Sequence, residues 1–173
     1  AGIVVGTLDD DEVAWKRIRG WCRIARSVAT VKKARIGVMG HVYEGMLDMN
    51  SDPTMFSGHF GMHCEHIELD DLQERLEQIG DSDVESKIEE INALFDFPEP
   101  GVDPIAGPAK QEDIRWSARV ACALDRLVAD FDLTGLAYYY RGLNGNEQER
   151  LGSSLIVGSS ILTGQGIPIA GEL

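Results

Sequence analysis

The chain has 173 residues, of which 43% are hydrophobic and 26% are charged, values typical of a globular domain rather than a disordered chain. It carries 29 Asp and Glu against 16 Lys and Arg, and the net charge of −13 argues against nucleic acids and anionic membranes as partners. No apolar run approaches the roughly 20 residues that span a bilayer. The three cysteines lie far apart, which predicts no disulfide framework and favours a reducing cytoplasm.

Residues 1–33 are expected to be a lead-in segment before the main domain. A short strand is predicted at 3–6, followed by an acidic triplet at 9–11 that suits the positive end of a helix dipole. A receiver-type acidic pocket is the alternative for this triplet, but it needs a preceding strand in a complete sheet and a lysine on another strand. Apolar residues at helical spacing predict a helix to about residue 29: Trp15, Ile18, Trp21, Cys22, Ala25 and Val28.

Residues 34–173 are expected to form one α/β domain. The apolar run at 34–40 predicts its first strand, and a loop rich in polar and aromatic side chains follows at 41–50. Asp52 and Pro53 are typical of an N-cap and a first helical position, so a short helix is predicted to about Phe60.

The middle of the chain predicts a second strand at 64–69 and a helix that begins at Asp70 and Asp71. Ser82 and Glu85 have the spacing of a capping box, which predicts a further helix with Val84, Ile88, Ile91, Leu94 and Phe95 on its apolar side. Four of the six prolines fall at 96–110, which is therefore expected to be a long loop.

The last third predicts a long helix at 111–130, a strand at 136–140, a helix at 146–163 and a strand at 167–170. Strands separated by helices favour right-handed crossovers and a parallel sheet. The expected fold is therefore a flavodoxin-like three-layer α/β/α sandwich with a small sheet of about four strands.

Polar and aromatic residues follow each predicted strand. Because the carboxyl ends of parallel strands share one edge, where ligands bind in open sheets, these residues are candidates for a small-molecule site. The expected rim consists of His41, Tyr43, Met46, Asp70, Tyr140, Arg141 and Glu172. Strand alternation puts Tyr138 and Tyr140 on one side of the sheet and Tyr139 on the other.

Neither a dinucleotide fingerprint nor a P-loop is present, since Gly37, Gly40 and Gly45 are spaced differently from both. The four histidines fall within 26 residues, close to Cys64, Glu65 and Glu68, which suggests a transition-metal site as one alternative. Against it, successive strand residues such as His63 and Cys64 face opposite ways. The histidines are His41, His59, His63 and His66.

Two segments resemble the L-arabinose isomerase group, which is related to L-fucose isomerase. The first runs from Arg35 through Gly-His-Val-Tyr-Glu-Gly-Met-Leu-Asp-Met to Asp52 and Phe60-Gly61, and the second is Gly166-Ile-Pro-Ile-Ala-Gly-Glu172. Leu143-Asn144-Gly145 is similar to the turn that leads toward that glutamate in the family. The loop after the first strand departs from the arabinose isomerase pattern, which leaves the sugar open.

The resemblance implies an aldose–ketose isomerase that moves a proton between C1 and C2 through an enediol. It implies a divalent ion, usually manganese, held by two glutamates and two histidines. Glu172 matches the first glutamate, as metal ligand and catalytic residue, and the other ligands are expected beyond residue 173. Tyr140 matches a pocket-lining aromatic position, and Met46 or Tyr43 approximates a pocket-lining methionine. The chain is thus expected to be the central domain of a larger enzyme, cut at its active-site glutamate, with residues 1–33 as the lead-in segment and crossover helix from a missing N-terminal domain.

The resemblance further implies a cytoplasmic homo-oligomer, a trimer or hexamer, with a sugar as substrate and no nucleic-acid or membrane partner. The isolated chain is expected to be inactive and to bind no manganese tightly. A free-standing flavodoxin-like module that binds a small molecule or another protein is the alternative function.

Overall fold

The computed structural model describes residues 2–7, 9–98, 101–102, 107–142 and 145–172, with backbone only at Asp48 and Glu172. The chain forms two compact units. The first consists of Ala1–Ala34 with Asp52–His63, and the second consists of Arg35–Ser51 with Cys64–Leu173. The segment at 3–6 has no regular structure, so the strand predicted there is wrong.

The first unit contains helices α1 (Glu12–Lys33) and α2 (Pro53–Phe60). The acidic triplet does begin α1, because the carboxylate of Asp11 accepts a hydrogen bond from the backbone N–H of Ala14 at 2.9 Å. Asp52 likewise caps α2 by accepting from the N–H of Thr54 at 2.8 Å. Both helix starts were predicted from the sequence, whereas α1 continues four residues past its predicted end.

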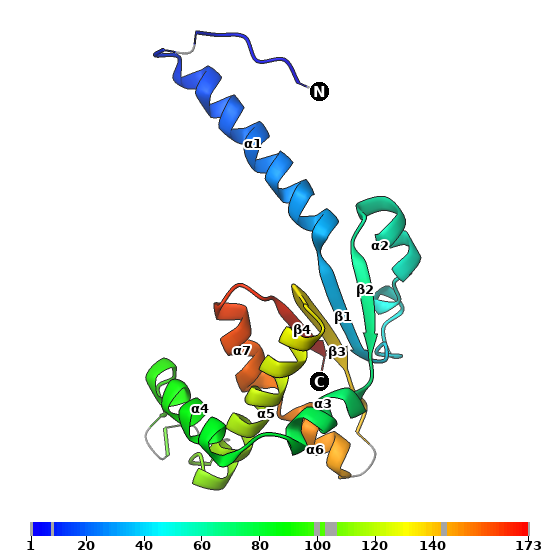
Figure 1. Cartoon of the computed structure of the whole chain (residues 1–173), viewed down its shortest axis with the longest axis vertical. Coiled ribbons are helices and arrows are strands. Elements are labelled where there is room, and N and C mark those ends of the chain that lie inside the picture. Colours follow the sequence, from blue (N-terminus) through cyan, green and yellow to red (C-terminus); the bar gives the residue numbers. More distant parts are fainter. Residues whose placement is uncertain (1, 8, 99–100, 103–106, 143–144, 173) are drawn as a thin grey trace. The chain divides into compact units, whose positions relative to one another are not determined.

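The second unit is built on a four-stranded sheet whose order is β2-β1-β3-β4 (Figure 1). The strands are β1 (Arg35–Gly40), β2 (His63–Ile67), β3 (Gly135–Tyr139) and β4 (Ile169–Glu172). All run parallel, and the mixed α/β architecture agrees with the predicted flavodoxin-like sandwich. This order follows from right-handed crossovers, which carry the chain outward from β1 to β2 and then back across β1 to β3.

Five helices of this unit share one apolar core with the sheet (Figure 1). They are α3 (Leu69–Glu77), α4 (Asp81–Leu94), α5 (Gln111–Asp130), α6 (Glu147–Ser153) and α7 (Ile156–Gly164). The core between them joins alternate strand residues such as Met39, Leu136 and Tyr138 to the apolar stripe of α5. The period-2 pattern of the strands and the helical period of α5 both match this burial.

The last strand lies two residues further along the chain than the sequence predicted. The N–H of Ile167 donates to the carbonyl of Leu162 at 2.9 Å, so Ile167 still belongs to the end of α7. Pro168 has no N–H to give to a strand ladder. Strand β4 therefore begins at Ile169 and includes Glu172, which was expected just past its end.

The single helix predicted at 146–163 is two helices, α6 and α7, which are interrupted at Ser154 and Leu155. The hydroxyl of Ser154 accepts a hydrogen bond from the indole N–H of Trp116 at 2.8 Å and donates to the carbonyl of Arg150 at 2.6 Å. A serine held in this way competes with the regular helical pattern, so the break is set by a residue on α5 that is distant in sequence.

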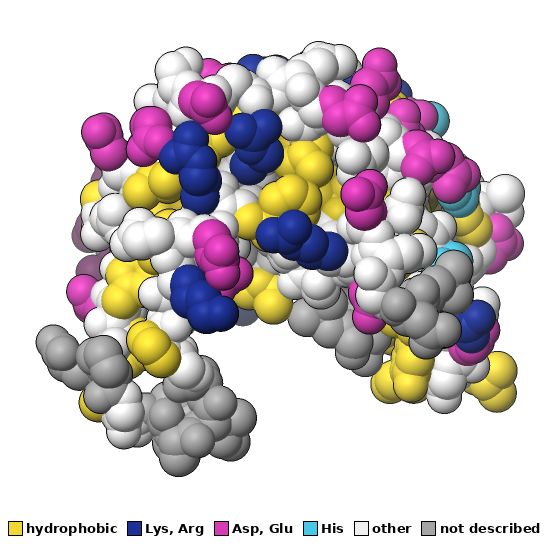
Figure 2. Space-filling model, turned by 90° about the horizontal axis from the view of Figure 1, so that it is seen from below, with side chains coloured by type: hydrophobic (Ala, Val, Ile, Leu, Met, Phe, Trp, Pro, Cys, Tyr) yellow, Lys and Arg dark blue, Asp and Glu magenta, His cyan; other side chains and the backbone are white. Residues whose placement is uncertain are grey.

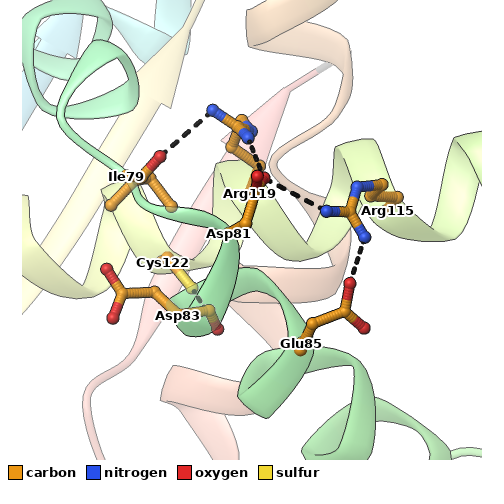
Figure 3. A network of polar contacts seen from close by, with 7 residues as sticks. All are labelled: Ile79, Asp81, Asp83, Glu85, Arg115, Arg119 and Cys122. Atoms are coloured by element: carbon orange, nitrogen blue, oxygen red, sulfur yellow. Dashed lines mark hydrogen bonds and ion pairs between the residues drawn. The ribbon is translucent and has the colours of Figure 1, made fainter.

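Helix α4 begins at Asp81, with Gly80 as its N-cap, so the capping box predicted at Ser82 and Glu85 is wrong. Asp81 accepts from the guanidinium groups of Arg115 and Arg119, both at 3.1 Å, and Glu85 pairs with Arg115 (Figure 3). These carboxylates are thus engaged by α5 and not by the α4 backbone.

Basic side chains lie among carboxylates and apolar surface on the side of the molecule seen from below in Figure 2. Arg75 pairs with Asp130 at 2.9 Å, and Arg126 pairs with Asp83 at 2.8 Å. Ion pairs this exposed contribute about 0–1 kcal/mol each, so the apolar core and not the surface charge holds the helices on the sheet.

Three groups in the core of the second unit hold their protons more tightly than in an unfolded chain. Burial raises the pKa of the Cys122 thiol, which donates to the carbonyl of Asp83, and burial also raises the pKa of the Tyr138 phenol. Burial alone would lower the pKa of the Lys87 ammonium. Its hydrogen bonds to Asp125 at 2.7 Å and to Glu90 at 2.5 Å outweigh that effect and raise the pKa.

A group whose pKa is raised by folding stabilises the folded state fully at pH values below its unfolded pKa. That stabilisation is lost as the pH rises through the folded pKa. We therefore expect the free energy of unfolding by urea to stay level up to about pH 7.5 and to fall above about pH 8, where an unfolded thiol with a pKa of about 8.5 ionises. Cys122→Ala should remove the earliest part of that fall. Stability that rises between pH 9 and pH 11 would contradict these proton affinities.

Candidate functional site

Three neighbouring strands end level with one another at the carboxyl edge of the sheet. Gly40 of β1 is the partner of Tyr139 of β3, and Tyr139 is in turn the partner of Glu172 of β4. The row Gly40–Tyr139–Glu172 therefore crosses the sheet, and the loops that follow β1 and β3 leave from the same edge. Strands β1 and β3 also flank the point where the strand order reverses, which is the usual ligand position in open parallel sheets.

An aromatic cluster of His41, Tyr43 and Tyr139 stands at this point of the edge. The His41 and Tyr139 rings meet edge to face with centroids 5.0 Å apart, and the Tyr43 and Tyr139 centroids are 5.2 Å apart. The N–H of His41 donates to the carbonyl of Tyr139 at 3.2 Å, which fixes the loop after β1 to the end of β3. Such a cluster offers ring faces and edges to a small ligand.

Tyr139 was not among the predicted site residues, whereas Tyr140 was. The ring of Tyr140 packs on Gly152 of α6, where an added Cβ would lie 3.2 Å from the tyrosine, and its hydroxyl lies 3.4 Å from the Asn146 side-chain oxygen. Tyr140 thus follows Tyr138 to the side of the sheet that carries the helices, as alternation predicted. The tyrosine that contacts the rings of the loop after β1 is Tyr139.

Charged and thioether groups of the predicted rim lie beside this cluster in sequence. Glu44, which directly follows Tyr43, forms an ion pair with Arg141, which follows Tyr140. Met46 is exposed and precedes a short 3₁₀ helix, Leu47–Met49. Asp70 is exposed in the first turn of α3. The edge of the sheet therefore carries aromatic surface together with the ion pair of Glu44 and Arg141.

The remaining histidines are spread over different elements. His59 lies in α2, and His63 and His66 lie in β2, where alternation turns them to opposite faces of the strand. Within the described part of the chain, no three His, Cys, Asp or Glu side chains come together as a metal site. The described residues therefore do not make up a divalent-metal centre by themselves.

Of the segments that resemble the isomerase group, Leu143-Asn144 lies outside the described residues. Glu172 is placed by its backbone alone, opposite Tyr139. A search of the described helices found no segment with the length and hydropathy required to cross a bilayer. Comparisons with protein-family models and with curated proteins gave no match.

Proposed function

We propose that this chain is the central α/β domain of an aldose–ketose isomerase that acts on a sugar such as L-arabinose or L-fucose. The observation that supports this most directly is the row Gly40–Tyr139–Glu172. Through this row, the Ala170-Gly171-Glu172 segment of β4 ends level with β1, which lies on the other side of β3 and leads into the Tyr43–Met49 loop. These are the two segments whose sequences resemble the L-arabinose isomerase group.

In the proposed reaction the carboxylate of Glu172 takes the proton from C2 of the open-chain aldose. The electrons of the broken C–H bond form the C1–C2 double bond of an enediol while the aldehyde oxygen gains a proton. Delivery of a proton to C1, with loss of the proton on O2, gives the ketose. The carboxylate must stand within hydrogen-bond reach of the moving proton, which an edge position allows.

The aromatic cluster supports a sugar as the ligand of this edge. The rings of His41 and Tyr43, which pack on the buried ring of Tyr139, provide apolar surface for the C–H face of a sugar. Arg141 supplies donors and Glu44 supplies acceptors for hydroxyl groups, since both side chains are exposed. Tyr140 and Met46 enter as pocket-lining residues through the family resemblance.

The proposal is tested by expressing the complete open reading frame that encodes this chain and following L-arabinose and L-fucose in D₂O with Mn²⁺ by NMR. We expect ketose to form with deuterium incorporated at C1 or C2, and Glu172→Gln to lower the rate by about 10²–10⁴-fold. Glu112→Gln, an exposed carboxylate in the first turn of α5, is the matched control and should leave the rate unchanged.

Failure of the complete protein to convert either sugar, or full activity of Glu172→Gln, would overturn the proposal. The 173-residue chain alone is expected to show neither turnover nor tight manganese binding. Saturable sugar binding without any turnover by the complete protein would favour the alternative, a flavodoxin-like binding module.

We place the protein in a reducing cytoplasm because Cys22, Cys64 and Cys122 are free thiols.

A further inference from the structure

Strand β4 places Glu172 at the end of a short edge strand. In the part of the chain that the structure describes, β4 consists of Ile169–Glu172 and has β3 as its neighbour in the sheet. An edge strand is held by one ladder of backbone hydrogen bonds and by the side chains that pack on it. The position of Glu172 therefore depends on what fixes the end of β4 to β3 and to the core.

The ring of Tyr138 occupies the place that a side chain on residue 171 would take. Tyr138 and Gly171 are partners in the ladder between β3 and β4. A Cβ on Gly171 would lie 2.5 Å from Cε1 of Tyr138 and 2.6 Å from its hydroxyl oxygen, well inside van der Waals contact. Gly171 is not one of the glycines with positive φ, so its backbone conformation does not itself require a glycine. The glycine before Glu172 is required by the ring.

The core of the second unit holds this ring in place. Tyr138 is 8% exposed and belongs to the apolar core. Burial raises the pKa of its phenol, and the hydroxyl of Ser159 on α7 acts in the opposite direction as a hydrogen-bonding neighbour. The Ser159 oxygen is buried and meets no described group at ordinary hydrogen-bond geometry, so its contact with the phenol is a loose one. The ring, more than its hydroxyl, therefore fixes the end of β4.

From this contact we infer that Tyr138 is a positioning residue: its ring packs on Gly171 and thereby sets where Glu172 stands at the edge of the sheet. This role rests on the proposed function, in which Glu172 moves the proton. Tyr138 acts through Gly171 and not on the sugar, because its side chain is buried in the core. A misplacement of about 1 Å lowers a rate by up to about 10²-fold, so loss of the ring should act on the chemical step.

Kinetics of the complete protein with L-arabinose and L-fucose test this role. Tyr138→Leu removes the ring and should lower kcat by about 10–10²-fold, with KM changed by less than about threefold. Tyr138→Phe keeps the ring and loses only the loosely held hydroxyl, so kcat should stay within about threefold of the unchanged protein. Gly171→Ala brings a Cβ against the ring and should lower kcat about as much as Tyr138→Leu does.

The double variant with both Tyr138→Leu and Gly171→Ala separates the ring contact from a general weakening of β4. A leucine lacks Cζ, Cε1 and the hydroxyl, which are the atoms that a Cβ on residue 171 would meet. The kcat of the double variant should therefore exceed the value expected from multiplying the two single losses by about tenfold or more.

Two control variants match these changes away from the contact. Phe131→Leu removes a ring that also packs on the core, before the start of β3, and Gly164→Ala adds a Cβ that meets no atom within 4 Å. Both should leave kcat unchanged. Amide hydrogen exchange, measured by mass spectrometry on the same proteins, should be faster at Ile169–Glu172 in Tyr138→Leu than in Phe131→Leu.

Full kcat in Tyr138→Leu, or single losses that simply multiply in the double variant, would overturn the role of Tyr138 and leave the isomerase intact. A Tyr138→Leu protein that does not fold leaves the decision to Gly171→Ala, where full kcat would have the same meaning. Absence of turnover by the unchanged complete protein would instead overturn the proposed function, and with it the catalytic importance of the contact.

Discussion

Gly40→Ala is expected to destabilise the second unit by about 2–4 kcal/mol and to disrupt the aromatic cluster. Gly40 has φ of +81°, a left-handed conformation that costs an alanine about 1–2 kcal/mol. A Cβ at this position would also lie 2.1 Å from the carbonyl oxygen of Tyr139. Because that oxygen belongs to the neighbouring strand and accepts the His41 N–H, relief of the clash must separate the ends of β1 and β3.

Urea unfolding measures the loss of stability, and near-UV circular dichroism reports the loss of fixed tyrosine surroundings in the folded variant. Gly164→Ala serves as the control, since a Cβ there meets no atom within 4 Å and the residue ends α7. It should leave both signals unchanged within about 0.5 kcal/mol. Equal stability of the two variants would show that the ends of β1 and β3 are not held together as described.

The sequence predicted correctly those helices whose start and end are set by residues in the same short segment. Asp52 and Pro53 begin α2, and Gly61, with φ of +76°, ends it, as the sequence predicted. Apolar residues recur at helical spacing over Gln111–Asp130, and this pattern predicted α5 with the bounds that the structure shows. In these cases the cap and the apolar face lie in the same short segment, so no tertiary information is required.

The elements that were misplaced depend on contacts that apolar periodicity does not reveal. The break after α6 is made by the indole of Trp116, which lies 38 residues before Ser154. The start of β4 depends on whether Ile167 completes α7 or enters the sheet, and its N–H donates to Leu162. Apolar periodicity does not distinguish these choices, since an apolar residue suits both environments.

The candidate site was predicted in its position but not in all of its members. Parallel strands with aligned ends follow from the βα alternation, so the edge that carries His41, Tyr43 and Arg141 was predictable. Tyr139 was not predicted because the strand was expected to end at Tyr140, one residue beyond the observed end of β3. The alternation of side chains already separated it from Tyr138 and Tyr140, and its proximity to the loop after β1 follows once β1 and β3 are neighbours.

Leu124→Ala is expected to be the most destabilising single change in the apolar core, at about 3–5 kcal/mol. Leu124 is 0% exposed at the centre of α5, and it lies against Gly158 of α7, where an added Cβ would be 3.2 Å from its Cδ2. Removing its three outer carbons leaves a cavity between two helices whose backbones already approach closely, so the surroundings cannot collapse to fill it.

Since native domains are stable by only about 5–15 kcal/mol, this loss should lower the midpoint of thermal unfolding by many degrees. Leu47→Ala removes the same atoms from a side chain that is 89% exposed, and it should change the free energy of unfolding by less than about 0.5 kcal/mol. The difference between the two variants, measured by urea unfolding, isolates burial from side-chain chemistry. Similar losses in both would mean that α5 does not form the centre of the core that fixes the sheet edge in place.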